Sequence, residues 1–172
     1  MTDTAPATVP QPAPILRWVS VSAGQLALTH RPRLRGAPQL RAEGCSRLVT
    51  LLSAREGAER IGDLAQEAGL AWTWLPLNNG RPPTGAAAWS QIADGLGLLA
   101  ARLDAGESIA LHCSAGIHRT GMLAYALLRV VGYPPARALD AIERMRPVTR
   151  AGLRSDHIQF GDAIAEWLRT EV

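Results

Sequence analysis

Residues 112–121 of this chain read His112-Cys113-Ser114-Ala115-Gly116-Ile117-His118-Arg119-Thr120-Gly121. A short apolar run over 108–111 comes before them, and a second apolar run of helical character over 122–128 follows. A strand, a tight turn and a helix N-terminus in this order gather backbone N–H groups around an anion. Because a cysteine starts the turn and an arginine ends it, the stretch predicts a site that attacks phosphorus.

Strand-like and helical patterns alternate along the rest of the chain. Strands are predicted over 15–21, 25–28, 47–52, 71–77 and 108–111, and helices over 38–43, 55–68, 86–103, 134–145 and 153–169. We expect Pro147 to end the fourth of these helices. The alternation predicts a single α/β domain with a central, mostly parallel sheet of four or five strands flanked by helices. Four prolines in residues 1–14 predict a flexible Pro/Ala-rich tail, which leaves 15–172 as the catalytic domain.

The composition restricts the class of protein. The chain has 172 residues, 47% of them hydrophobic and 19% charged, which suits one soluble domain. A net charge of +3 favours anionic partners only slightly. Two cysteines cannot build a disulfide framework, and neither a secretory signal nor a run of about 18 apolar residues is present. We therefore expect a cytoplasmic protein without a membrane partner, and its oligomeric state is left open.

Each residue of the motif has an expected task. A cysteine at a helix N-terminus beside an arginine can hold a thiolate near neutral pH, so Cys113 is the predicted nucleophile. Arg119 would grip two phosphate oxygens with its planar fork, and Thr120 would hydrogen-bond the leaving sulfur. His112 would orient the cysteine from behind. Substrate phosphate would bind the backbone N–H groups of Ser114, Ala115, Gly116, Ile117, His118 and Arg119.

Metal binding and cofactor use are not predicted. A metal site made of His112, Cys113 and His118 is disfavoured because no paired Cys-x-x-Cys or His-x-x-x-His spacing occurs.

The motif resembles the active-site signature of the protein tyrosine phosphatase superfamily, which is His-Cys, five residues, Arg and then Thr or Ser. The chain length and element order resemble the compact dual-specificity branch, and so do the segments 26–28, 48–52, 132–139 and 146–147. The resemblance implies the fold of that superfamily and a two-step, metal-free hydrolysis of a phosphorylated substrate. In the first step Cys113 takes the phosphoryl group, and in the second step water removes it.

One expected residue is missing. The family carries an aspartate some thirty residues before the cysteine, on a mobile loop, and this aspartate protonates the leaving oxygen. Here the matching loop carries Asn78 and Asn79, and we align Asn79 with the missing acid. An amide cannot donate a proton as an acid does. The remaining candidate acids are Asp94, Asp104 and Asp156, and Gln159 falls where the family places a water-positioning glutamine.

Two further features have alternative interpretations. Arg31, Arg150 and Arg154, expected in loops, either steer an anionic substrate towards Cys113 or lie on solvated faces. Cys45 is either a buried core thiol or a disulfide partner that protects Cys113 from oxidation.

Three functions remain after these observations. The first is a cysteine-dependent phosphatase of the phosphotyrosine or dual-specificity type, acting on a phosphorylated protein or small molecule. The second keeps this mechanism but acts on a leaving group of low pKa, such as that of an RNA or nucleotide 5′-triphosphate. The third is a weakly active phosphate-binding module, although a pure binder has no need of Cys113.

Overall fold

The computed structural model describes residues 13–170. The tail predicted for 1–14 lies outside this range except for its last two residues, both of which are exposed. Within 13–170, no helix has the length and apolar character that crossing a bilayer requires.

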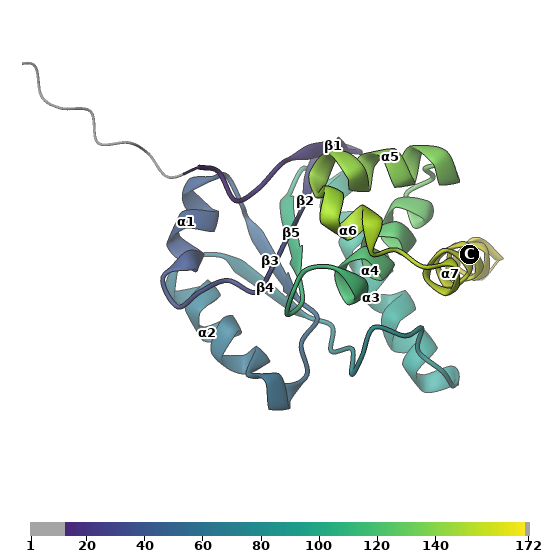
Figure 1. The fold of residues 1–172 in the computed structure, drawn as a ribbon, viewed down its shortest axis with the longest axis horizontal. Coiled ribbons are helices and arrows are strands. Elements are labelled where there is room, and N and C mark those ends of the chain that lie inside the picture. The colour runs from purple at the N-terminus through teal and green to yellow at the C-terminus, as the bar shows by residue number, and fades with distance from the viewer. Residues whose placement is uncertain (1–12, 171–172) are drawn as a thin grey trace, which may run out of the picture.

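A five-stranded sheet runs through the middle of the molecule (Figure 1). Its strands are β1 (Val19–Val21), β2 (Gly24–Thr29), β3 (Arg47–Thr50), β4 (Ala71–Trp74) and β5 (Ser108–His112). Their spatial order is β1-β2-β5-β3-β4, with β1 antiparallel to β2 and every other neighbouring pair parallel. This confirms the predicted class of fold. The strand that leads into the motif, β5, is central and has a partner on each side.

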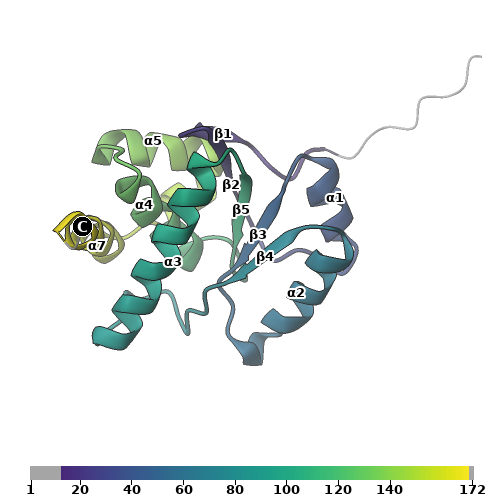
Figure 2. The same ribbon diagram turned by 180° about the vertical axis from the view of Figure 1, so that it is seen from behind.

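Helices cover both faces of the sheet (Figures 1 and 2). On one face lie α1 (Gly36–Ala42) and α2 (Ala58–Glu67), which enclose a smaller core cluster around Leu40, Leu48 and Ile61. On the other face lie α3 (Ala86–Asp104), α4 (His118–Val130), α5 (Pro135–Met145), α6 (Pro147–Ala151) and α7 (Ser155–Thr170). Residues 120–128 of α4 are all buried, so the helix that follows the motif forms the centre of the larger core.

Two helix predictions need correction. The predicted helix over 55–68 is divided into a 3₁₀ turn, η1 (Ala54–Glu56), and α2, because Gly57 adopts a φ of +84° between them. Pro147, which was expected only to end a helix, also begins α6. Proline is favoured at the first position of a helix, where its missing N–H has no intrahelical partner to lose. Arg150 therefore lies in a helix and not in a loop.

Candidate active site

The cysteine loop, residues 113–117, lies between the end of β5 and the start of α4. Parallel strands end at the same edge of a sheet, so the segments that follow β2, β3 and β4 meet beside this loop. A cavity of about 250 Å³ opens over it, lined by Cys113, Ser114, Ala115, His118 and Arg119 and, from the segment after β4, by Asn78, Asn79 and Gly80. The side chain of Cys113 lies at the bottom and only 3% of the residue is exposed.

The tight path of the cysteine loop depends on Gly116. Its φ is +69°, and a Cβ at this position would lie 2.2 Å from the carbonyl oxygen of Thr29 at the end of β2. The N–H of Arg31 donates to the carbonyl of Ser114 over 2.9 Å, so the same neighbouring segment also holds the other end of the loop. Any side chain larger than hydrogen at residue 116 would push the loop away from β2.

The surroundings of Cys113 favour its thiolate. Burial acts to raise the pKa of the thiol, but hydrogen bonds to the sulfur from the Thr120 hydroxyl and from the N–H groups of Thr120, Ile117 and Gly116 outweigh it. The net result is a Cys113 pKa below its ordinary value. The fully buried Thr120 hydroxyl has no hydrogen-bond partner within residues 13–170, so it is free to bind the sulfur. The sequence predicts these roles for Cys113 and Thr120, and both stay predictions.

His112 is fully buried behind the cysteine loop, and its tautomer follows from its neighbours. Its Nδ1 lies 3.0 Å from the carbonyl of Cys113, which only accepts, so Nδ1 carries the proton. Its Nε2 then accepts from the Thr50 hydroxyl at 2.7 Å, and that oxygen accepts in turn from the indole N–H of Trp72 at 2.9 Å. Burial is the main reason that the pKa of His112 falls to about 4, with the positive charges of Arg31 and Arg119 adding to it. The imidazole is neutral near pH 7 and orients the Cys113 backbone.

Arg119 is held by a residue that the sequence analysis missed. Its Nη1 and Nη2 each donate to a carboxylate oxygen of Glu56 at 2.8 Å, and Nη1 also donates to the carbonyl of Leu77 at 2.9 Å. The guanidinium has five N–H donors, so two remain, on the edge formed by Nε and Nη2. The pKa of Arg119 is raised first by Glu56 and further by the thiolate charge of Cys113. The free edge is thus the one available to a phosphate above the sulfur.

Glu56 is ionised at any physiological pH. The hydrogen bond from Arg119 is the main cause that lowers the pKa of Glu56 to about 2, and hydrogen bonds from the N–H and hydroxyl of Ser53 assist. The one sequence signal for this residue is the spacing Ser53-x-x-Glu56, a capping box at the start of η1. That signal indicates a helix start and gives no hint of a partner 63 residues further along the chain.

The outer side of the cysteine loop is held by Arg146, which lies between α5 and α6, and by Thr149 of α6. Nη1 of Arg146 donates to the carbonyls of Ala115 and Gly116 at 3.1 and 2.9 Å. The buried hydroxyl of Thr149 donates to the Gly116 carbonyl at 2.5 Å. With these carbonyls bound on the outside, the loop N–H groups are left to face the sulfur and its substrate. Arg146 and Thr149 are therefore structural partners of the loop that the sequence analysis did not assign.

No carboxylate lines the cavity. Asn78 and Asn79 stand at its wall, and Asn79 Oδ1 accepts the N–H of Arg81 at 2.9 Å. The next residue, Gly80, is anchored through its carbonyl, which accepts from Arg154 Nη2 and from His157 Nε2, each at 2.7 Å. The segment that carries the two asparagines is thus attached to the start of α7.

The other candidate acids lie elsewhere. Asp94 and Asp104 are exposed on α3, and Asp156 is paired with Arg154, whose hydrogen bonds keep the pKa of Asp156 below its ordinary value. Gln159 is exposed on α7 and is not among the cavity-lining residues. The structure therefore brings Asn79, but not Gln159, to the cavity.

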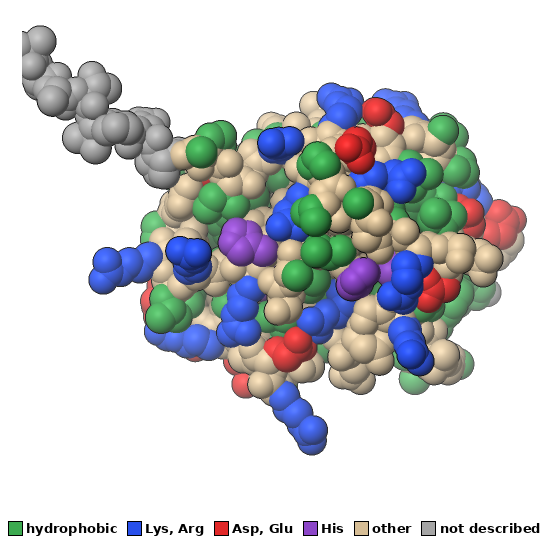
Figure 3. Space-filling view, in the orientation of Figure 1, with side chains coloured by type: hydrophobic (Ala, Val, Ile, Leu, Met, Phe, Trp, Pro, Cys, Tyr) green, Lys and Arg blue, Asp and Glu red, His purple; other side chains and the backbone are tan. Residues whose placement is uncertain are grey.

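Arginines surround the site on the face shown in Figure 3, where all blue side chains are arginines because the sequence contains no lysine. Of the predicted steering residues, Arg31 is exposed and donates to the Glu56 carbonyl, while Arg154 binds Asp156 and Gly80. Arg150 is half-buried in α6. Steering by these three stays a prediction.

Cys45 lies in the smaller core, buried beside Leu40 and Leu48, and its Sγ contacts the carbonyl of Arg47 at 3.2 Å. Burial raises the pKa of this thiol to about 11. Cys45 and Cys113 are both free, which favours the core interpretation of Cys45. Within residues 13–170, no group of three or more His, Cys, Asp or Glu side chains is placed to hold a metal ion.

A family model described as "Polymorphic toxin system, DSP-PTPase phosphatase" matches residues 30–132, which include the whole motif and most of the sheet. The chain belongs to this dual-specificity phosphatase family. It is a phosphatase, as the resemblance in the sequence implied. No curated protein matches the chain.

Solved structures of phosphatases share its fold. Kinase-associated phosphatase, solved with its catalytic-site cysteine replaced by serine, is 17% identical with a TM-score of 0.76, and the match covers 94% of this chain and all of that one. PTPMT1 in complex with PI(5)P is 15% identical with a TM-score of 0.69 over 90% of this chain and 98% of that one. Tk-PTP in its active form is 19% identical with a TM-score of 0.65 over 92% and 99%.

Proposed function

We propose that the chain hydrolyses phosphomonoesters through a cysteinyl-phosphate intermediate. The observation that carries the proposal is the position of Cys113. Its sulfur lies at the bottom of an open cavity, receives hydrogen bonds from the loop N–H groups, and faces the unoccupied edge of Arg119. A thiolate in such a cradle is a nucleophile placed against an anion-binding site.

In the first step the Cys113 thiolate attacks phosphorus, an S–P bond forms, and the bond from phosphorus to the leaving oxygen breaks. Nε and Nη2 of Arg119 and the loop N–H groups bind the phosphoryl oxygens in this step, where charge accumulates. In the second step a water oxygen attacks phosphorus and the thiolate leaves. The Thr120 hydroxyl then stabilises the departing sulfur, since the sulfur is the partner to which it is available.

The leaving oxygen receives no proton from a carboxylic acid of the cavity, because no Asp or Glu lines it, and we align Asn79 with the aspartate of the family. General acid catalysis typically contributes about 10²- to 10⁴-fold to a rate. This observation favours substrates whose leaving groups depart easily, so a phosphohydrolase acting on a nucleotide or RNA 5′-triphosphate is the second candidate. A phosphorylated protein or small molecule remains the first, in line with PTPMT1, which has been solved with a phosphoinositide.

Rapid mixing with 4-nitrophenyl phosphate tests the proposal. We expect a burst of 4-nitrophenol that matches the enzyme concentration, and phosphate covalently bound to Cys113 after acid quenching. Cys113→Ser should abolish both, while the Cys45→Ser variant serves as a matched control and keeps them. Hydrolysis at an unchanged rate in Cys113→Ser would overturn the mechanism.

A further inference from the structure

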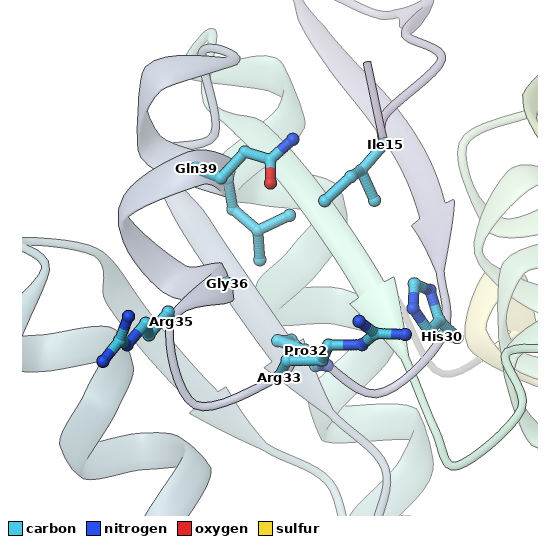
Figure 4. Close-up of a pocket in the computed structure, with 8 residues that line it drawn as sticks. Ile15, His30, Pro32, Arg33, Arg35, Gly36 and Gln39 are labelled. Atoms are coloured by element: carbon cyan, nitrogen blue, oxygen red, sulfur yellow. The ribbon is translucent and has the colours of Figure 1, made fainter. Parts of the chain in front are cut away.

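A second cavity opens on the other side of the cysteine loop, and the phosphatase mechanism does not use it. It has a volume of about 360 Å³ and lies between the segment after β2 and the helix α1 (Figure 4). Its lining residues are Ile15, His30, Pro32, Arg33, Arg35, Gly36, Gln39 and Leu40. A volume of this size is typical of a small-molecule site.

The cavity is adjacent to the reaction site through the backbone. His30 directly follows Thr29, which pairs with His112 across the sheet. A Cβ on Gly116 would lie 2.9 Å from the backbone nitrogen of His30, so the two segments are in direct contact. His30 therefore borders both the cysteine loop and the second cavity.

The polar side of the second cavity is cationic. Figure 4 shows the guanidinium of Arg33 directed towards the His30 ring, whereas Arg35 extends the opposite way. No carboxylate lines the cavity, and within residues 13–170 Arg33 makes no side-chain hydrogen bond or ion pair. Partial loss of solvent lowers the pKa of His30, and the positive charges of Arg146 and Arg33 lower it further. The positive charge at the lining thus comes from Arg33, with Arg146 near His30, and no carboxylate is among the lining residues.

The floor is apolar. Ile15, Pro32 and Leu40 contribute hydrocarbon surface, and Gln39 uses its amide nitrogen to bind Glu43. The carboxylate of Glu43 accepts from the N–H groups of Ile15 and Leu16 and forms no ion pair with Arg33. The combination of an apolar floor and a cationic rim suits a carbon skeleton that ends in an anionic group.

We propose that this cavity binds a second phosphate of the same substrate, and that the natural substrate is a small molecule with two phosphate groups. Arg33 and His30 bind the second phosphate while the cysteine loop binds the first, and the carbon skeleton lies on Ile15, Pro32 and Leu40. This inference rests on the proposed function, since it requires the first phosphate at Cys113.

A series of inhibitors of graded length tests the inference. Monophosphates and bisphosphates of straight-chain diols, graded in length, are measured as inhibitors of 4-nitrophenyl phosphate hydrolysis. These alkyl esters bind without being turned over quickly, because alkoxide is a poor leaving group. We expect one chain length at which the bisphosphate binds about tenfold more tightly than its monophosphate, as one exposed charge-assisted contact provides. Arg33→Gln should remove that advantage and leave the inhibition by monophosphates unchanged.

Arg60→Gln is the matched control, because it removes the same charge from an exposed residue of α2, which forms no wall of the cavity. An equal loss in Arg60→Gln would reduce the effect to general charge attraction and overturn the site. The site would also be overturned if no bisphosphate of any length bound more tightly than its monophosphate. It would likewise be overturned if only doubly phosphorylated peptides showed an Arg33-dependent gain in affinity. These measurements need only ordinary turnover of 4-nitrophenyl phosphate, so a negative result in the inhibitor series leaves the Cys113 mechanism unaffected. Full activity of Cys113→Ser, in contrast, would overturn the proposed function itself.

Discussion

Replacing Glu56 by glutamine tests whether Arg119 has to be held in place from behind. Each carboxylate oxygen of Glu56 accepts one hydrogen bond of 2.8 Å from the guanidinium. Glutamine keeps one acceptor and removes the charge. A hydrogen bond to a charged group contributes about 1.5–3 kcal/mol, and with the Glu56 side chain 34% exposed a loss of about 2 kcal/mol is reasonable. We therefore expect kcat/KM to fall roughly 30-fold.

Most of this loss should appear in kcat, because Arg119 binds the phosphoryl oxygens most strongly where charge develops in the transition state. The assay is steady-state hydrolysis of 4-nitrophenyl phosphate, with thermal unfolding to show that the variant is folded. Ser53→Ala is the control, since it removes one hydrogen bond to Glu56 but leaves the pair with Arg119 intact. A folded Glu56→Gln variant with full kcat/KM would refute the reasoning. So would an equal loss in Ser53→Ala, since the effect would then belong to the η1 turn.

Three further results are expected. Asn79→Asp should raise kcat/KM for phosphate esters with poor leaving groups and leave good ones nearly unchanged, which a leaving-group series measures; a uniform effect would contradict the alignment of Asn79 with the missing acid. The pKa of His112 is about 4 in the folded protein and about 6.5 in the unfolded chain, so the unfolded chain binds more protons below pH 6.5. The free energy of unfolding should therefore drop by up to about 3 kcal/mol as pH falls from 6.5 to 4. Denaturant titrations from pH 4 to 7 would show this, and a flat profile would speak against a buried neutral ring. Gly116→Ala should lower stability by about 2–4 kcal/mol and nearly abolish activity, because its Cβ would collide with the Thr29 carbonyl at a φ of +69°; a normal melting temperature and rate would disprove this tight contact.

Local sequence was sufficient for the parts of the site that lie within one turn of chain. The motif predicted a strand, a loop and a helix, and the structure confirms β5 and α4 on either side of Cys113. The alternation of strand-like and helical segments along the chain also predicted the mostly parallel sheet. Boundaries were less accurate: the strand predicted over 71–77 ends at Trp74, although the N–H groups of Leu75 and Leu77 still bind the β3 side.

Partners from distant segments could not be predicted, because sequence spacing carries no information about which side chains meet across a sheet edge. Glu56 matched a capping signal, and that local role concealed its pairing with Arg119. Arg146 received no role from the sequence, yet it binds two carbonyls of the cysteine loop. Pro147 was interpreted as a helix stop when it also starts α6, which places Thr149 against Gly116.

The two sides of the site, the cysteine loop and the segment that carries Asn79, differ in how firmly they are attached to the rest of the fold. The cysteine loop follows the central strand β5 and is held by hydrogen bonds from Arg31 on one side and from Arg146 and Thr149 on the other. Asn79 follows the edge strand β4, and its segment is held chiefly through the Gly80 carbonyl. A segment with fewer attachments tolerates substitution more readily. Substitutions that change substrate preference are therefore tolerated most easily at the β4 side. The attack on phosphorus stays the same, because buried hydrogen bonds from Trp72 to Thr50 and from Thr50 to His112 support the cysteine loop.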